Sequence, residues 1–298
     1  MNRDLTLIAI ALFTWGIGEG SYLYFQPIYL EKLGASPVAI GAVLGAVGFA
    51  MAITHIPAGY LADRLGRRKI LWAAWISGFA AALVMSLANS LAVFVTGMIL
   101  YGLTTFVSSP LSSYVTAARG ELSVGRALTL ISAVYNAGAI LGPLIGGFIG
   151  NRFGLEKIYP FAAMIYFISI LMVLNLRPQP VISVDTQSRQ TPMLNRGFIS
   201  ILAVIFLVFF AIYFPQPLTP NFLQNERGLS LSAIGQVGAV GSLGNVLLNL
   251  VLGKMSAFHG FLLSQVCVAF FALFLWKGSG IPIFMVGYFL LGGYRVAL

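Results

Sequence analysis

The chain has 298 residues, of which 59% are hydrophobic and 8% are charged, and its mean hydropathy is +0.92. Soluble domains carry about 25% charged residues, which give them a solvated surface. The composition therefore excludes a soluble enzyme. The formal charge of +9 comes from few ionisable side chains, so we interpret it as a signal of membrane topology and do not expect a nucleic-acid partner.

Long apolar runs separated by short polar segments occupy almost the whole chain. Because a helix crosses a bilayer with about 20 residues, the length allows roughly ten spans in an all-α membrane protein. The expected spans lie at about 5–27, 39–62, 70–88, 91–115, 127–150, 158–176, 198–218, 232–253, 260–276 and 282–298. The first span is too long for a cleavable signal peptide and contains Glu19.

Lys and Arg are concentrated in alternate loops, on the side that also holds the N-terminus. Basic loops face the cytoplasm, so we expect a multi-pass protein of the plasma (inner) membrane with a cytoplasmic N-terminus. The longest connection, 177–197, lies on the same side and is interpreted as a linker. It divides the chain into a six-helix N-terminal half, 1–176, and a partial C-terminal half of four helices, 198–298.

The second half repeats part of the first. Residues 221–235 resemble 27–41, and they share a glycine, a serine and a final Ala-Ile-Gly at equivalent positions. Residues 283–295 resemble 93–105 in the same way and keep two glycines and a phenylalanine. Repeated halves are a common construction of secondary transporters, and this repeat makes spans seven to ten the counterparts of spans one to four.

The loop after the second span carries a dense motif of glycine and charged residues. Its residues are Gly59, Leu61, Asp63, Arg64, Gly66, Arg67, Arg68 and Lys69. The glycines allow a tight turn and close backbone approach, and the basic residues hold the loop at the cytoplasmic face. The motif resembles the signature loop of the major facilitator superfamily. The resemblance implies a transporter that works by alternating access, with Asp63 in a gate between two halves.

The fifth span contains a second motif, built on Gly138, Gly142, Pro143, Gly146 and Gly147. Glycines spaced every four residues form a ridge on one helix face, where another helix can approach closely, and the proline bends the helix. The motif is similar to one that is associated with the drug:proton antiporter branches of the same superfamily. The resemblance thus implies export, with helix packing as the alternative reading.

The superfamily resemblance also implies twelve spans, whereas the sequence provides about ten. Counterparts of spans five and six do not follow in the second half. We therefore expect the chain to be truncated at its C-terminus.

Two full charges, Glu19 and Arg295, lie inside apolar runs. Charges at such positions are costly and usually face a cavity or a partner. The resemblance places both residues on helices that border the central cavity. We predict that Glu19 is the coupling carboxyl and is paired with Arg295 in one state, with a structural carboxyl as the alternative. Further candidates for the cavity are Tyr22, His55, Asn136, Tyr213, Asn245 and Asn249, whose alternative role is helix packing or an interfacial belt.

The sequence contains no phosphate-binding loop, metal-ligand cluster or nucleophile with a base, so we expect neither an enzyme nor a cofactor. The favoured function is proton-coupled efflux of small lipophilic or cationic compounds. We expect protons and the lipid bilayer as the further partners, and a monomer as the oligomeric state. The alternatives are uptake of a sugar or other metabolite, and a membrane sensor or inactive remnant that transports nothing.

Overall fold

The computed structural model describes the whole chain except residues 1, 180–195, 214–215, 253–254 and 294–298, and the side chains at 55–63, 196, 209, 211–212, 252 and 257. The described residues form helices and no strand. In chain order these are α1 (Arg3–Leu23), α2 (Gln26–Lys32), α3 (Pro37–Leu65), α4 (Arg67–Ser86), α5 (Leu91–Gly102), η1 (Leu103–Val107), α6 (Ser108–Ala118), α7 (Val124–Phe153), η2 (Leu155–Lys157), α8 (Ile158–Leu174), α9 (Arg196–Tyr213), η4 (Gln216–Leu218), α10 (Thr219–Asn225), α11 (Leu231–Leu252), α12 (Ala257–Lys277) and α13 (Ile281–Leu291).

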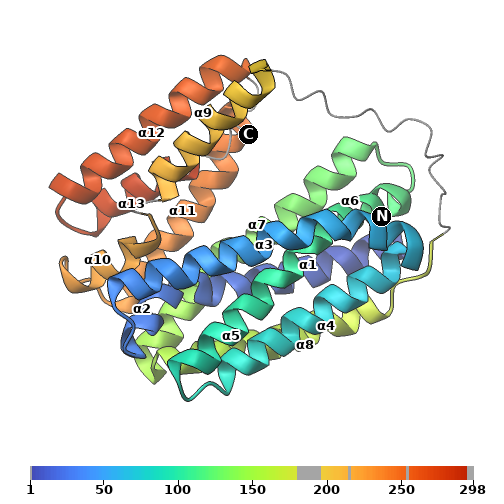
Figure 1. The fold of residues 1–298 in the computed structure, drawn as a ribbon, viewed down its shortest axis with the longest axis horizontal. Coiled ribbons are helices and arrows are strands. Elements are labelled where there is room, and N and C mark those ends of the chain that lie inside the picture. The colour runs from blue at the N-terminus through green and yellow to red at the C-terminus, as the bar shows by residue number, and fades with distance from the viewer. Residues whose placement is uncertain (1, 180–195, 214–215, 253–254, 294–298) are drawn as a thin grey trace.

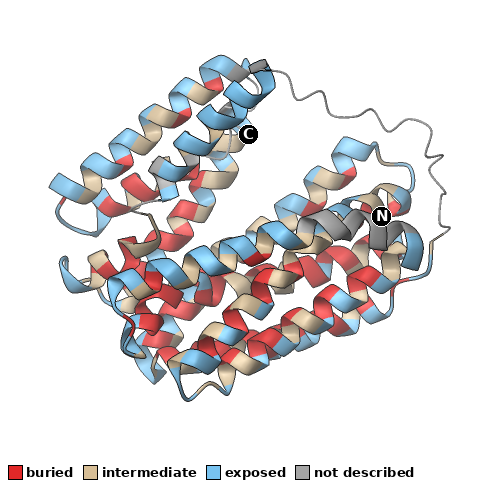
Figure 2. Cartoon of the chain, viewed as in Figure 1, coloured by how far each residue is buried: buried red, intermediate tan, exposed pale blue. Residues whose placement is uncertain are grey.

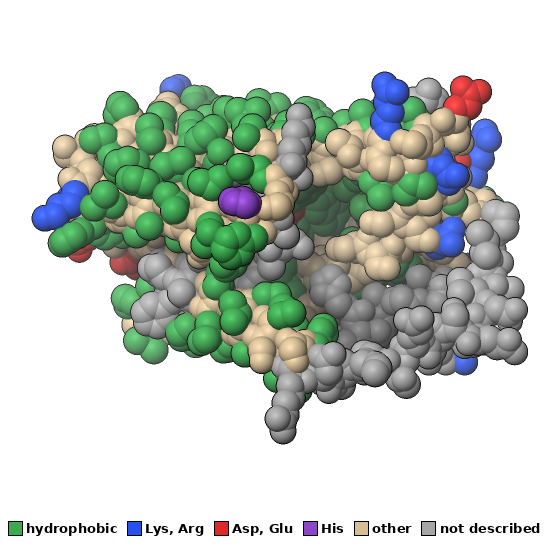
Figure 3. All heavy atoms as spheres, turned by 90° about the horizontal axis from the view of Figure 1, so that it is seen from above, with side chains coloured by type: hydrophobic (Ala, Val, Ile, Leu, Met, Phe, Trp, Pro, Cys, Tyr) green, Lys and Arg blue, Asp and Glu red, His purple; other side chains and the backbone are tan. Residues whose placement is uncertain are grey.

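The expected all-α membrane architecture is confirmed. In the described part of the chain, eight helical segments are long and apolar enough to cross a membrane, and Gly197–Val208 and Ile281–Leu291 are shorter apolar helices. Large apolar side chains on the outer faces are exposed, with Phe206 and Trp276 at 66% and 70%, whereas the buried residues face the interior of the bundle (Figure 2). A surface of this kind is suited to lipid. Figure 3 shows the same apolar covering, with Lys and Arg toward the edges of the molecule.

The fourth expected span is not one continuous helix, because η1 interrupts it between α5 and α6. Pro110 lacks the backbone N–H that a continuous helix would direct at the carbonyl of residue 106, and it occupies the first turn of α6, where that donor is not needed. The hydroxyls of Thr104 and Thr105 bond to backbone carbonyls three residues earlier, which favours tighter turns. The continuous apolar run at 91–115 predicts one unbroken span, and its hydropathy gives no sign of this break.

Helices of the two parts of the chain meet along α7 and α11 (Figure 1). Gly147 of α7 lies against Gly235 of α11, and the Pro143 carbonyl also faces Gly235. The absence of side chains lets the two backbones approach closely. The linker 177–197 falls mostly outside the described residues, so the predicted domain boundaries stay a prediction.

A second contact joins the short helices α2 and α10. The Asn221 amide is buried and donates to the Pro27 carbonyl at 3.1 Å and to the Glu31 carboxylate. Asn225 donates to the same carboxylate at 2.9 Å. Pro27 and Asn221 are 194 residues apart, as are Glu31 and Asn225, which is the register of the sequence repeat. Equivalent positions of the two repeats therefore contact one another at this end of the bundle.

Candidate functional site

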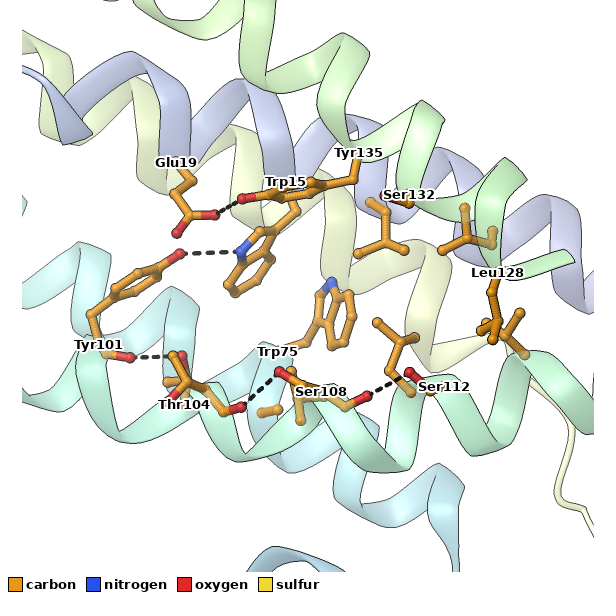
Figure 4. A pocket seen from close by; sticks show the side chains of 17 residues that line it. Trp15, Glu19, Trp75, Tyr101, Thr104, Ser108, Ser112, Leu128, Ser132 and Tyr135 are labelled. Atoms are coloured by element: carbon orange, nitrogen blue, oxygen red, sulfur yellow. Dashed lines mark hydrogen bonds between the residues drawn. The ribbon is translucent and has the colours of Figure 1, made fainter. Parts of the chain in front are cut away.

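The first half of the chain forms an open cavity of about 520 Å³ between α1, α4, α7 and the interrupted helix α5–η1–α6 (Figure 4). Its lining residues are Leu12, Trp15, Glu19, Ala74, Trp75, Tyr101, Thr104, Thr105, Val107, Ser108, Leu111, Ser112, Val115, Leu128, Ile131, Ser132 and Tyr135. A volume of this size lies within the range of small-molecule sites, about 300–1,000 Å³. The cavity is therefore large enough for a drug-sized or metabolite-sized compound.

Glu19 contributes the carboxylate of the cavity. The Tyr135 hydroxyl donates to its Oε2 at 2.6 Å, a short, charge-assisted distance. Glu19 lies about one turn before the end of α1, and Tyr135 lies on α7. The hydrogen bond thus fixes the carboxylate at the seam between these two helices.

The glycine ridge of α7 brings this seam together. A Cβ at Gly142 would lie 2.6 Å from the Gly20 Cα, and a Cβ at Gly138 would meet the Phe13 carbonyl. The residues on both sides of the seam must therefore be small, and α1 and α7 make the most extensive helix contact of the described fold. The motif glycines, except Gly147, pack against the helix that carries Glu19.

Aromatic rings form one wall of the cavity. Trp15 stacks on Tyr166 with ring centroids 4.1 Å apart and an interplanar angle of 17°, and Trp75 lies 5.2 Å from Trp15. Each indole N–H has a partner: Trp15 donates to the Tyr101 hydroxyl at 3.2 Å, and Trp75 donates to the buried Ser169 at 2.8 Å. The rings are held in place by these bonds, and their faces suit apolar or cationic groups.

Another wall carries hydroxyl groups from the break in the fourth span. Thr104, Thr105, Ser108 and Ser112 donate to carbonyls three or four residues earlier, at 2.7–3.0 Å. Because each hydroxyl has one proton and two lone pairs, these bonds consume the protons and leave acceptor lone pairs. This wall therefore presents hydrogen-bond acceptors to the cavity.

The cavity has an acidic character although the chain is basic overall. Among its described lining residues, Glu19 is ionisable as a carboxylate, and no Lys, Arg or His contributes. A carboxylate, acceptor hydroxyls and aromatic faces together favour a ligand that is positively charged or rich in N–H donors.

The structure brings one of the predicted cavity residues, Glu19, to this cavity, and places several others elsewhere. Tyr22 is fully buried behind the wall and bonds to Tyr166. Asn136 donates to the Ser132 carbonyl of its own helix at 2.7 Å. Asn245 and Asn249 share a face of α11, as predicted, and Asn249 donates to the Asn245 side chain.

Three further predicted residues lie at the edges of what the structure describes. Tyr213 is 45% exposed at the end of α9. His55 is in α3, but its side chain is outside the described residues, and Arg295 is outside them entirely. The predicted pairing of Glu19 with Arg295 therefore stays a prediction.

The predicted gating loop joins α3 to α4. Gly66 has φ 83°, a conformation that favours glycine, and Arg68 lies over the Trp72 ring at 4.1 Å. Arg64 is exposed and Arg67 begins α4. Gly59 and Asp63 are in α3, within the stretch whose side chains are not described, so the role of Asp63 stays a prediction.

Sequence reasoning did not single out Trp15, Trp75, Tyr101, Tyr135 or the hydroxyl wall. Aromatic residues are common in apolar spans, so the rings gave no separate signal. A usable signal was present in residues 104–113, where Thr and Ser accompany Pro110 within an apolar run. Such a cluster indicates a local break that lines a cavity.

Comparisons with known proteins agree on one superfamily. The model described as Major Facilitator Superfamily matches residues 8–297. Multidrug resistance protein MdtG of Enterobacter lignolyticus is 28% identical over 178 residues, covering 58% of this chain and 43% of that protein. The chain thus aligns with less than half the length of such curated relatives.

Solved structures resemble the chain over nearly its full length. The nucleoside transporter NupG gives a TM-score of 0.76 at 17% identity, covering 100% of this chain and 80% of that chain. A D-xylose-proton symporter gives 0.68 at 14% identity, covering 99% and 79%. At these identities the likeness shows the fold alone.

Proposed function

Because the chain belongs to the major facilitator superfamily, we propose that it is a secondary transporter that exports small lipophilic or cationic compounds in exchange for protons. The transported compound binds in the cavity of the first half, and Glu19 is the coupling carboxyl. Exchange across the membrane follows from alternating access of the two halves around a fixed site.

The single observation that carries the proposal is the position of Glu19. Its carboxylate lines an aromatic, acceptor-rich cavity whose described walls contribute no basic side chain. A charge within the membrane costs several kcal/mol, by roughly the insertion scale, and either a proton or a cationic compound in the cavity can neutralise the carboxylate. Competition between compound and proton for one carboxylate couples their movements in opposite directions.

The relatives support export in a limited way. MdtG is named a multidrug resistance protein, and the alignment covers 58% of this chain. The motif around Gly142 adds the likeness to antiporter branches noted above. Uptake of a sugar or other metabolite is the alternative within transport, and the hydroxyl wall is the feature that would serve it. A non-transporting sensor is the alternative outside transport.

Inverted membrane vesicles with an imposed pH gradient test the proposal. We expect accumulation of lipophilic cations that collapses with the gradient, and we expect Glu19→Gln to abolish the gradient dependence because the titratable group is lost. The matched control is Glu121→Gln, which removes a carboxylate from an exposed turn between α6 and α7. Undiminished gradient dependence in Glu19→Gln would make Glu19 structural, and His55 would become the next candidate. Absence of gradient-driven flux for all compounds in the wild type would favour the sensor.

A further inference from the structure

Three tyrosine hydroxyls form a line from the packed core of the first half to the cavity. The Tyr22 and Tyr166 hydroxyl oxygens are 3.1 Å apart, and Tyr166 donates to the Tyr101 hydroxyl, also at 3.1 Å. Tyr22 and Tyr166 are fully buried, whereas Tyr101 lines the cavity. The line thus connects groups that no ligand can touch to one that a ligand can.

The bonds in this line have a direction. Because Tyr166 uses its single proton toward Tyr101, the bond between Tyr22 and Tyr166 must be donated by Tyr22. Tyr101 accepts a second bond, from the Trp15 indole, at 3.2 Å. The bonds from Tyr166 and Trp15 are therefore both accepted by the Tyr101 hydroxyl, through its two lone pairs, and the Tyr22 hydroxyl also lies within reach of it. The Tyr101 proton is used in neither of these two accepted bonds.

We propose that the Tyr101 hydroxyl is the donor with which the cavity recognises a hydrogen-bond acceptor on the transported compound, and that Tyr166 and Tyr22 are positioning residues that direct its proton. The proposal rests on the proposed function, because it takes the cavity as the binding site. The compound it selects carries a cationic group and, at some distance along the molecule, an ether, carbonyl or similar acceptor.

Several other hydroxyls of the cavity have already donated their protons. The hydroxyls of Thr104, Thr105 and Ser108 have given their protons to backbone carbonyls, and Tyr135 has given its proton to Glu19. Figure 4 shows the labelled Tyr101 and Glu19 side chains facing the same part of the cavity, from α5 and α1. A donor beside a carboxylate can hold one compound through two different groups.

Polarisation strengthens the Tyr101 donor. In a chain of hydrogen bonds, each accepted bond makes the next donor stronger, by about 10–30% in condensed-phase estimates. A neutral hydrogen bond of this type changes binding by roughly 2- to 10-fold. Removing the Tyr101 hydroxyl should therefore lower the binding affinity by most of this factor. Removing the Tyr166 hydroxyl should lower it by a smaller part.

The test compares two cations that differ at one atom. The first is 2-(benzyloxy)ethyl-trimethylammonium, and the second is 4-phenylbutyl-trimethylammonium, in which a methylene replaces the ether oxygen. Binding of both to the purified protein is measured by calorimetry, and the quantity of interest is the ratio of their affinities. A ratio separates recognition of the oxygen from changes in fold or overall affinity, which affect both cations alike.

We expect Tyr101→Phe to lower the preference for the ether by roughly 2- to 10-fold and Tyr166→Phe to lower it less. The double variant should resemble Tyr101→Phe, because Tyr166 acts through Tyr101. The matched control is Tyr159→Phe. Tyr159 is a fully buried ring beside Tyr22, and its hydroxyl has no hydrogen-bond partner among the described residues, so the ratio should not change.

The outcomes separate this inference from the proposed function. Equal ratios in the wild type, Tyr101→Phe and Tyr159→Phe would overturn the role of Tyr101 and leave the cavity as the binding site. A ratio that falls equally in Tyr101→Phe and Tyr159→Phe would show a general packing effect and would also overturn it. If neither cation binds, or if Glu19→Gln leaves both affinities unchanged, the proposed function itself is wrong, and the inference is wrong with it.

Discussion

Substitution of Gly142 by alanine tests whether the seam between α1 and α7 positions the Glu19 carboxylate. The added Cβ would lie 2.6 Å from the Gly20 Cα and 2.7 Å from the Ser21 nitrogen. Non-bonded carbon atoms prefer about 3.5–4.0 Å, so the two helices must separate by roughly 1 Å. Because the nearest atoms belong to the backbone of α1, no side-chain rotation can relieve the contact.

Two opposing effects determine the size of the change. Overpacking a tight contact costs about 1–3 kcal/mol, and alanine in place of glycine within a helix returns up to about 1 kcal/mol. The expected net loss is roughly 1–2 kcal/mol of stability. Separation of the helices would also stretch the 2.6 Å hydrogen bond from Tyr135 to Glu19, so affinity for cations should fall together with stability.

The assay is thermal unfolding of the purified protein in detergent, with Gly125→Ala as the matched control. Gly125 is in the same helix, and a Cβ there would meet nothing within 4 Å. We expect Gly125→Ala to keep or raise the melting temperature and Gly142→Ala to lower it. Equal melting temperatures for the two variants would show that the seam accommodates a methyl group, and the argument that glycines position Glu19 would fail.

Two further predictions concern the α2–α10 contact and the loop between α3 and α4. Glu31→Ala removes the acceptor shared by the Asn221 and Asn225 amides. We expect it to lower the free energy of unfolding by roughly 1 kcal/mol and to lengthen the α2–α10 distance measured between spin labels. An unchanged distance would show that this contact does not hold α2 against α10. Asp63→Asn should leave membrane insertion intact, because the basic residues that set the loop topology remain. It should slow transport in vesicles. Transport at the wild-type rate would show that the loop anchors the helices at the membrane surface and has no role as a gate.

Much of the fold could be predicted from the sequence, because apolar length alone specifies a spanning helix. Each of the ten expected runs overlaps a described helix, and two of them correspond to the shorter apolar helices Gly197–Val208 and Ile281–Leu291. The division of the first run into α1 and α2, and the break at Leu103–Val107, could not be read from hydropathy. Both features depend on local hydrogen bonds of the backbone. The mean hydropathy of a segment does not detect such bonds.

The candidate site was predictable only where a residue was unusual for its surroundings. Glu19 stood out as a charge in an apolar run, and the structure places it in the cavity. Asn245 and Asn249 were equally unusual, but they bond to one another, because an amide can satisfy itself one turn along its own helix. Tyr101 was ordinary in sequence, and the role proposed for it rests on partners on other helices, which spacing along one helix cannot supply.

The location of the cavity has a consequence for how the protein is made. Every lining residue in the described part of the chain lies between Leu12 and Tyr135, and α8, which packs against α1 and α4, is complete by Leu174. Since synthesis proceeds from the N-terminus and folding units form as they emerge, the walls of the cavity can assemble while the ribosome is still translating the linker. The described walls of the cavity are then complete before the helices that follow residue 198 have been synthesised.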